Sequence, residues 1–420
     1  MSPSRLSLPS PERRTRGDII ASALIAAGLL VGGVGVWLTS DAHSVEHHVA
    51  NDSSTVLATG NAELPPRPRE LWTTTTQGKD LVVDQEGVVQ INGTKVRMLE
   101  AATGAERWSY NKGEDVCAVT KGWEKTTVVF RGPKGCGQAI SFDSKTGQYW
   151  SARDSIAPDD VASFRSEDII GILSPARLET WRSDLVRTVE VGKMPTPVKV
   201  GKQEYTHCNF TSVGTAGTLL ATVQECPGEK DGKKYARLLN TTPEDSDAPE
   251  SWHVYRVPAG SEIIGANEHR AAIAIPAAGG KKARIQSLDK EGHFEEFPVD
   301  VGPDLHQRLQ DHDSAPFQPL TIQTGSMVGW FNGRALVALN PETFRPLWTL
   351  PGAQGVGTEL NGKLAVPMRD NGIALVDPSS GKVERTIGVD RGGYEGPVEI
   401  AFTGQTILEK RGAKVVALGA

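Results

Sequence analysis

The sequence lacks the short motifs that mark many enzymes. It contains no G-x-S-x-G nucleophile elbow, no H-E-x-x-H zinc motif and no Walker A loop. The glycines of GAQGVG at 352–357 resemble a dinucleotide loop, but no helical pattern follows them, so a turn is expected there. No catalytic residue is predicted.

Cysteine is scarce, with four residues in 420. They form two close pairs, Cys117 with Cys136 and Cys208 with Cys226. Four cysteines permit three connectivities, and we favour the local one because each pair joins segments that resemble neighbouring strands. Each bridge would close a loop of about 20 residues, worth on the order of 3 kcal/mol. Four free thiols are the alternative, and the spacing does not fit a zinc site.

Positive charge is also limited. Lys and Arg total 45 against 51 Asp and Glu, a net charge of −6. Residues 1–38 carry a net +2, so the remaining chain carries −8. Nucleic-acid binding requires a basic face, and this composition argues against it.

Only one long apolar run is present, at 19–38, and no charge interrupts it. As a helix it would span roughly 30 Å, the thickness of a hydrocarbon core. Three arginines lie within 13–16, and no Lys or Arg follows the run before Arg67. The positive-inside rule then places the N-terminus in the cytoplasm and the rest outside. No cysteine directly follows the run, which excludes a lipoprotein anchor.

We therefore predict four parts in a single-pass cell-membrane protein. They are a cytoplasmic tail (1–18), a transmembrane helix (19–38), an extracytoplasmic tether (39–67) and a folded body (68–420). A cleaved signal peptide, with SDA at 40–42 as its processing site, is the alternative.

A repeat of about 40 residues runs through the folded body. Its common form is an apolar strand end, a turn rich in Asx, Pro, Ser, Thr or Gly, and a strand that often carries Trp. Four examples are LEAATGAERWSY (99–110), SFDSKTGQYWS (141–151), LNPETFRPLWTL (339–350) and LVDPSSGKVERTI (375–387). About four strands per repeat indicate the blades of an all-β propeller.

The first and last strands of the body predict how the ring closes. Seven units fit between 79 and 390, and the last unit, 396–420, has only three strands. The strand ELWTTTT near 70–76 stands alone and would supply the fourth, which completes an eighth blade. We expect Trp72 to occupy the position held by Trp108, Trp150 and Trp348 in their blades. Seven blades are the alternative, since the pattern is weak over 156–260.

The turn-plus-tryptophan repeat resembles the tryptophan-docking repeat of pyrroloquinoline-quinone-type eight-bladed propellers, over residues 68–420. The resemblance is to the non-catalytic propeller of bacterial outer-membrane assembly, which implies a protein-binding scaffold. The layout also resembles that of membrane-anchored envelope proteins of actinobacteria. Enzymes of this fold bind quinone and calcium, but the adjacent cysteine pair and a convincing calcium set are missing here. No cofactor or metal is therefore predicted.

Two segments contain several histidines, which are common metal ligands. His43, His47 and His48 are interpreted as solvated tether residues. The segment 305–317, with His306, Asp311, His312 and Asp313, is interpreted as a surface insertion between blades.

The sequence predicts an extracytoplasmic scaffold that binds unidentified envelope or membrane proteins. The alternative is a quinoprotein-like enzyme, or another small-ligand or glycan binder, that uses the central funnel.

Overall fold

The structure is a computed structural model that describes residues 15–50, 65–84, 87–194, 200–228, 234–299 and 319–420. It divides into two units, residues 1–46 and 47–420. The first unit contains helix α1 (Arg16–Thr39) and the short 3-10 helix η1 (Asp41–Ser44). Thr15 and Asp18 form a capping box at the start of α1. The helix is long and apolar enough to cross a membrane, by length and composition.

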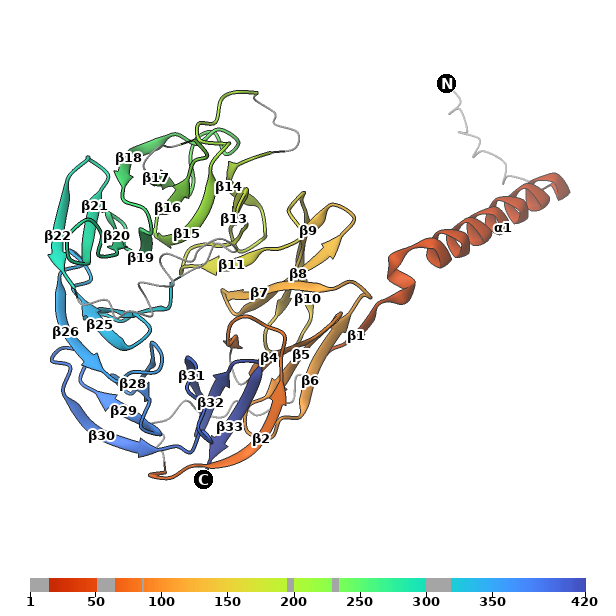
Figure 1. Ribbon diagram of the computed structural model, residues 1–420. Coiled ribbons are helices and arrows are strands. Elements are labelled where there is room, and N and C mark those ends of the chain that lie inside the picture. The colour runs from red at the N-terminus through yellow and green to blue at the C-terminus, as the bar shows by residue number, and fades with distance from the viewer. Residues whose placement is uncertain (1–14, 51–64, 85–86, 195–199, 229–233, 300–318) are drawn as a thin grey trace, which may run out of the picture. The chain divides into compact units, whose positions relative to one another are not determined.

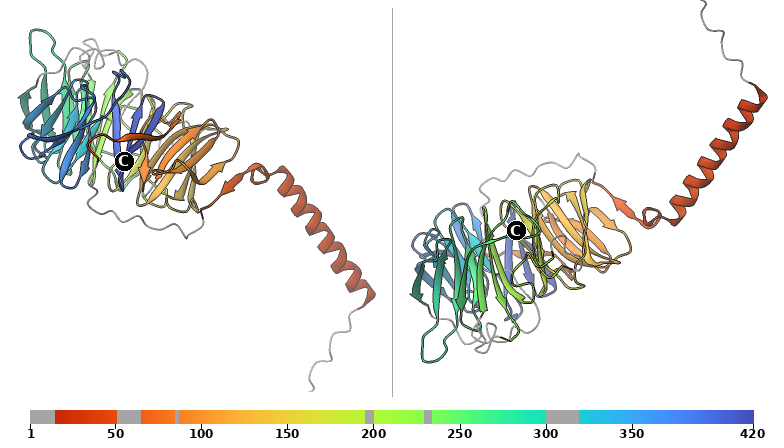
Figure 2. Two further views of the ribbon diagram at one scale, coloured as in Figure 1. Left: turned by 90° about the horizontal axis from the view of Figure 1, so that it is seen from below. Right: turned by 90° about the horizontal axis from the view of Figure 1, so that it is seen from above.

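The second unit is a ring of eight antiparallel sheets, which confirms the eight-bladed propeller (Figure 1). Seen from the side, the strands run across the thickness of the ring (Figure 2). We number the blades 1 to 8 from the sheet that begins with β3. In each blade the innermost strand comes first in the chain and the following strands are added outward. Blades 1 and 8 also take an outermost strand, β1 and β2, from the residues that precede the ring.

The strands of blades 1 to 4 follow one another along the chain. They are β3 (Val83–Asp84), β4 (Gly87–Asn92), β5 (Lys95–Glu100) and β6 (Glu106–Asn111); β7 (Val116–Gly122), β8 (Lys125–Gly132), β9 (Gly135–Asp143) and β10 (Tyr149–Asp154); β11 (Ala162–Arg165), β12 (Ile170–Leu173), β13 (Arg177–Trp181) and β14 (Arg187–Gly192); and β15 (Asn209–Ala216), β16 (Leu219–Glu225), β17 (Lys234–Asn240) and β18 (Ser251–Val257).

Blades 5 to 8 continue the order. They are β19 (Glu262–Ala266), β20 (Arg270–Ile275), β21 (Arg284–Asp289) and β22 (Phe294–Pro298); β23 (Thr321–Gln323), β24 (Val328–Phe331), β25 (Ala335–Leu339) and β26 (Pro346–Pro351); β27 (Thr358–Leu360), β28 (Lys363–Met368), β29 (Gly372–Val376) and β30 (Val383–Gly388); and β31 (Val398–Thr403), β32 (Thr406–Arg411) and β33 (Lys414–Gly419).

The apolar core lies between neighbouring blades. Alternating Val, Ile, Leu and Ala side chains from the middle strands of one blade meet those of the next, which is how stacked sheets bury both faces. Between blades 8 and 1, for example, Leu408 and Ala417 pack in one buried cluster with Val88 and Leu99. The core therefore continues across the point where the ring closes.

Strand β2 (Arg69–Thr75) closes the ring, as predicted. It pairs antiparallel with β33, so the order in blade 8 is β2-β33-β32-β31. Trp72 stands opposite Ala417 in this ladder. The isolated strand thus acts as a clasp that joins the start of the propeller to its end.

Blade 1 contains one strand that the sequence did not predict. Strand β1 (Glu46–His48) falls within the predicted tether, yet it is the outermost strand of the blade 1 sheet, next to β6. No sequence pattern distinguishes this three-residue strand, because its pairing partner lies about 60 residues away.

Candidate functional site

A cavity of about 1450 Å³ lies at the centre of the ring. Residues from the innermost segment of every blade line it, which places it on the axis of the propeller in Figure 1. The lining also includes several turns that follow the innermost strands, so the cavity reaches one face of the ring. Pockets of this size accept a small ligand or a segment of another protein.

One wall of the cavity carries a network of opposite charges. Glu399 accepts hydrogen bonds from the backbone N–H of Leu81 at 2.7 Å and from Lys410 Nζ at 3.2 Å. Asp80 lines the cavity beside this pair and is exposed to it. Desolvation raises the pKa of Asp80 and of Glu399, and nearby Lys410 opposes the rise in both.

The same wall continues onto blades 2 and 3. Lys121 donates a hydrogen bond from Nζ to the carbonyl of Val83, and desolvation lowers its pKa. Desolvation also lowers the pKa of Arg165, although Asp80 and Asp84 partly offset this. Carboxylates and cations on this wall therefore largely compensate one another.

At the mouth of the cavity, negatively charged side chains outnumber positively charged ones. Five exposed carboxylates lie in or beside the turns that follow the innermost strands, and the lining includes no Lys or Arg besides Lys121 and Arg165. These carboxylates are Glu124, Glu167, Asp168, Glu268 and Glu359. We call this group the acidic mouth. A concave surface lined by one sign of charge focuses the field and attracts the opposite sign.

Three of the four singled-out tryptophans dock onto the next blade. Trp72, Trp108 and Trp348 each donate a hydrogen bond from Nε1 to a backbone carbonyl. The acceptors are the carbonyls of Ala101, Ser144 and Pro378, at 2.8, 2.9 and 3.0 Å. Each indole packs against a turn of the next blade that contains a glycine with positive φ. These glycines are Gly104, Gly147 and Gly381. A Cβ at Gly147 would lie 2.5 Å from the ring of Trp108, so only glycine fits.

Trp150 differs from the predicted position by one residue. A β-bulge between Tyr149 and Ser151 leaves Trp150 in the bulge, and Ser151 stands opposite Ser141, where a docked indole would be. Trp150 is therefore 58% exposed, with Lys125 Nζ 4.5 Å from the centre of its ring. The expectation that Trp150 matches Trp108 is wrong, because the sequence does not reveal where the bulge falls.

Blade 4 shows the same offset with a different side chain. Trp252 lies in the bulge of β18, and His253 takes the docked position opposite Leu238. A Cβ at Gly292 of the next blade would lie 2.7 Å from the His253 ring. An imidazole here replaces the indole, which is why a search for tryptophan alone misses this junction.

Both local disulfides are present. Cys117 is bonded to Cys136 and Cys208 to Cys226, and no free cysteine remains. The second bridge joins the ends of neighbouring strands, as expected. The first joins β7 to β9 past the end of β8, so these two cysteines do not lie on neighbouring strands.

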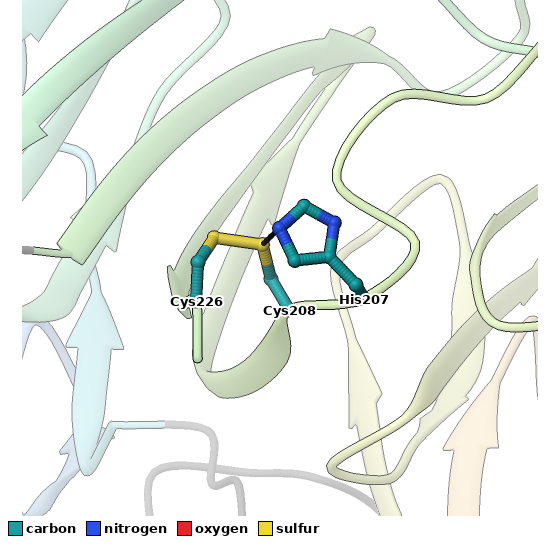
Figure 3. Close-up of side chains that lie close together, drawn as sticks. All are labelled: His207, Cys208 and Cys226. Carbon is teal, nitrogen blue, oxygen red and sulfur yellow. Dashed lines mark hydrogen bonds between the residues drawn. A yellow bond between two sulfur atoms is a disulfide. The ribbon is translucent and has the colours of Figure 1, made fainter. Parts of the chain in front are cut away.

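The second disulfide lies next to a histidine (Figure 3). Nε2 of His207 is 3.7 Å from Sγ of Cys208, and this trio is the single group with metal-ligand spacing in the described part of the chain. Both sulfurs are bonded to each other, whereas a metal requires thiolates. The bonded form is therefore a structural bridge.

The side chains of His43, His47 and His48 are all exposed to solvent, as interpreted from the sequence. His43 packs edge-on against Trp37 in the first unit, while His47 contacts residues of the propeller. The second candidate, with His306, Asp311, His312 and Asp313, lies outside the described residues.

Sequence reasoning missed the acidic mouth. Four members lie in short turns at 123–124, 166–168 and 267–268, and Glu359 lies in β27, so the group is spread over segments about 40 to 100 residues apart in the chain. The available signal was an acidic residue two positions after the innermost strands of blades 2, 3 and 5. Reading it required the strand boundaries in the degenerate middle of the repeat.

Comparison with known proteins supports the fold. No family model and no curated protein matches the sequence. The computationally designed Ika8 protein has a similar structure, with a TM-score of 0.51, 13% identity, and coverage of 84% of this chain and 99% of Ika8. BamB from Moraxella catarrhalis matches with a TM-score of 0.44, 13% identity, and coverage of 84% and 100%. At this identity the likeness concerns the arrangement of the chain alone.

Proposed function

We propose that this protein is a single-pass membrane-anchored, extracytoplasmic propeller that acts as a binding scaffold for cell-envelope proteins. The location is supported by helix α1, by the arginines that precede it, and by two disulfides, which persist in oxidising compartments. An anchor confines the propeller near the membrane and raises its effective concentration for membrane partners.

The observation that carries the binding role is the acidic mouth of the central cavity. Five exposed carboxylates lie where turns from several blades converge. The turns are short and belong to a closed ring, so the surface needs little ordering when a partner binds. The chemistry fits a partner segment rich in Lys and Arg, attracted first by long-range charge and then held at the rim.

Crosslinking in the membrane tests this role. Full-length protein would be crosslinked in its host membrane and its partners identified by mass spectrometry. One variant removes the mouth charges with Glu124→Gln, Glu167→Gln, Asp168→Asn, Glu268→Gln and Glu359→Gln. A matched control removes five exposed carboxylates that do not line the cavity: Glu244, Glu250, Glu291, Glu342 and Glu395, each to Gln.

The proposal expects one reproducible envelope partner with the wild type and with the control, and its loss with the mouth variant. Recovery should also fall as the salt concentration rises, because exposed charges are screened. Equal recovery in all three proteins would exclude the mouth as the binding surface. Background partners alone, at normal expression, would exclude the scaffold role.

The size of the cavity favours one second candidate, a small-ligand binder. About 1450 Å³ is large enough for a cofactor or glycan. Thermal-shift screening of the full-length protein against sugars, quinones and divalent ions separates the two functions. A ligand that stabilises the wild type and protects Asp80 and Lys121 from chemical labelling would favour this candidate.

A further inference from the structure

The segment that links the two units is bound to the propeller at its C-terminal end. Among the described residues, blade 1 alone has a fifth strand, because β1 lies along the outer edge of β6. The exposed edge of a sheet offers unpaired N–H and C=O groups, and adding a strand satisfies them. Figure 1 shows this strand beside β6.

The backbone contacts extend past β1 onto the neighbouring blade. The N–H of Ala50 donates a hydrogen bond to the carbonyl of Thr146 at 2.8 Å. Thr146 belongs to the turn between β9 and β10 of blade 2, while β6 belongs to blade 1. Residues 47–50 therefore bridge two blades rather than extend one sheet.

A side chain adds specificity to this contact. Nε2 of His47 lies 2.7 Å from the carbonyl oxygen of Gly147, so the imidazole must donate through that nitrogen. Its ring meets Tyr110 and Phe142 edge-on, with centroid separations of 5.2 and 5.8 Å. Tyr110 and Phe142 are both buried and come from adjacent blades. His47 thus lies against the edges of two buried rings while its outer side stays exposed to solvent.

We infer that residues 47–50 are a docking strand and that β6, the Asp143–Gln148 turn and the rings of Tyr110 and Phe142 form its docking surface. Docking shortens the segment between α1 and the propeller from residues 40–67 to residues 40–45, which include the 3-10 helix η1. Even fully extended, six residues reach roughly 20 Å, against about 95 Å for the whole segment. The docking strand therefore acts as a short leash that limits how far the propeller can move from its anchor. The inference does not depend on any partner.

Hydrogen exchange of the full-length protein in lipid nanodiscs tests the docking strand. The amides of residues 47–50 should exchange slowly in the wild type. His47→Ala removes the hydrogen bond and the ring contacts, so exchange there should accelerate by about tenfold or more. Ala50→Pro removes the N–H donor to Thr146 and should accelerate exchange of the neighbouring amides similarly.

His48→Ala is the matched control, because no hydrogen bond or ring contact is observed for this neighbouring imidazole in the described part of the chain. Exchange in the control should equal that of the wild type, and exchange in β20 and β21 should be unchanged in every variant, which shows an intact propeller. Rapid exchange of residues 47–50 in the wild type would overturn the inference. Equal exchange in the His47 and His48 variants would exclude the docking surface.

Discussion

At the residue scale, four of the described blade junctions depend on a pairing of one ring with one glycine. Trp108 is 1% exposed, and its indole lies over Gly147, whose φ is +73°. The indole nitrogen is satisfied by a carbonyl of the next blade. Each of the three docked indoles therefore contributes both apolar burial and a hydrogen bond that crosses between sheets.

Substitutions at these positions should separate docked from bulged tryptophans. Trp108→Ala should lower the free energy of unfolding by about 3 to 5 kcal/mol, as expected for a buried aromatic side chain. Gly147→Ala should also destabilise, because the added Cβ meets the indole and φ is unfavourable. Trp150→Ala should cost less than about 1 kcal/mol, since most of its ring is already in solvent. Chemical denaturation measures all three, and equal losses at Trp108 and Trp150 would contradict the assigned register.

The cavity wall makes a pH-dependent prediction for Asp80. Desolvation raises its pKa, so the folded state holds a proton that the unfolded state releases, and stability falls as pH rises above about 4. Asp80→Asn does not titrate and should be more stable than the wild type at pH 7, with the difference vanishing near pH 3.5.

Asp184 should change stability with pH in the opposite direction, because its pKa is lowered. A hydrogen bond from Arg182 lowers its pKa to about 2, so its contribution is present at neutral pH and lost as pH falls toward 2. Asp184→Asn should therefore be slightly less stable than the wild type at pH 7. Denaturant midpoints from pH 3 to 8 check both signs. A parallel response of the two variants would contradict the assigned environments.

At the element scale, β2 has the most consequential position, since it is the strand from the start of the propeller that pairs with its last strand, β33. The sequence was sufficient to predict it, because a strand with no local partner matched a unit that lacked one. The bulges were not predictable, since a bulge is a property of the ladder and not of the residue types around it. The strand at 46–48 was not predictable either, because it is too short to show alternation.

Weakening the clasp should loosen blade 8 before other blades. Trp72→Ala removes the bond to Ala101 and the contact with Gly104. Amide exchange in β31, β32 and β33 should then accelerate more than in β16 and β17 on the opposite side of the ring. Trp150→Ala serves as the control for loss of an indole in a blade's outer strand. Uniform acceleration around the ring would show that β2 has no special role in closure.

At the scale of the whole molecule, the eight sheets surround a polar cavity, and separate buried clusters fill the junctions between neighbouring blades. The number of blades could be predicted from the spacing of turns in the sequence. The acidic mouth could not be predicted, because its residues are distant in the chain and meet only in the closed ring. Its chemistry could be read from sequence only after each innermost strand had been located.

The proposed topology can be measured directly. In intact cells or spheroplasts, an added protease should reach a cleavage site placed in the loop at 276–282 of the propeller. A tag fused before residue 1 should stay protected until the membrane is permeabilised. The reverse pattern would contradict the assignment of the N-terminus to the cytoplasm.

The pairing of β2 with β33 also determines when the propeller can close during synthesis of the chain. Thr73 bonds to Val415, a partner 342 residues later in the chain. At about 5 to 20 residues per second, the ribosome needs roughly 20 to 70 s to make that partner. During this interval the nascent propeller keeps exposed strand edges at both ends. Synthesis of β33 thus decides when the propeller becomes resistant to aggregation, and a chaperone that shields strand edges would be needed only until then.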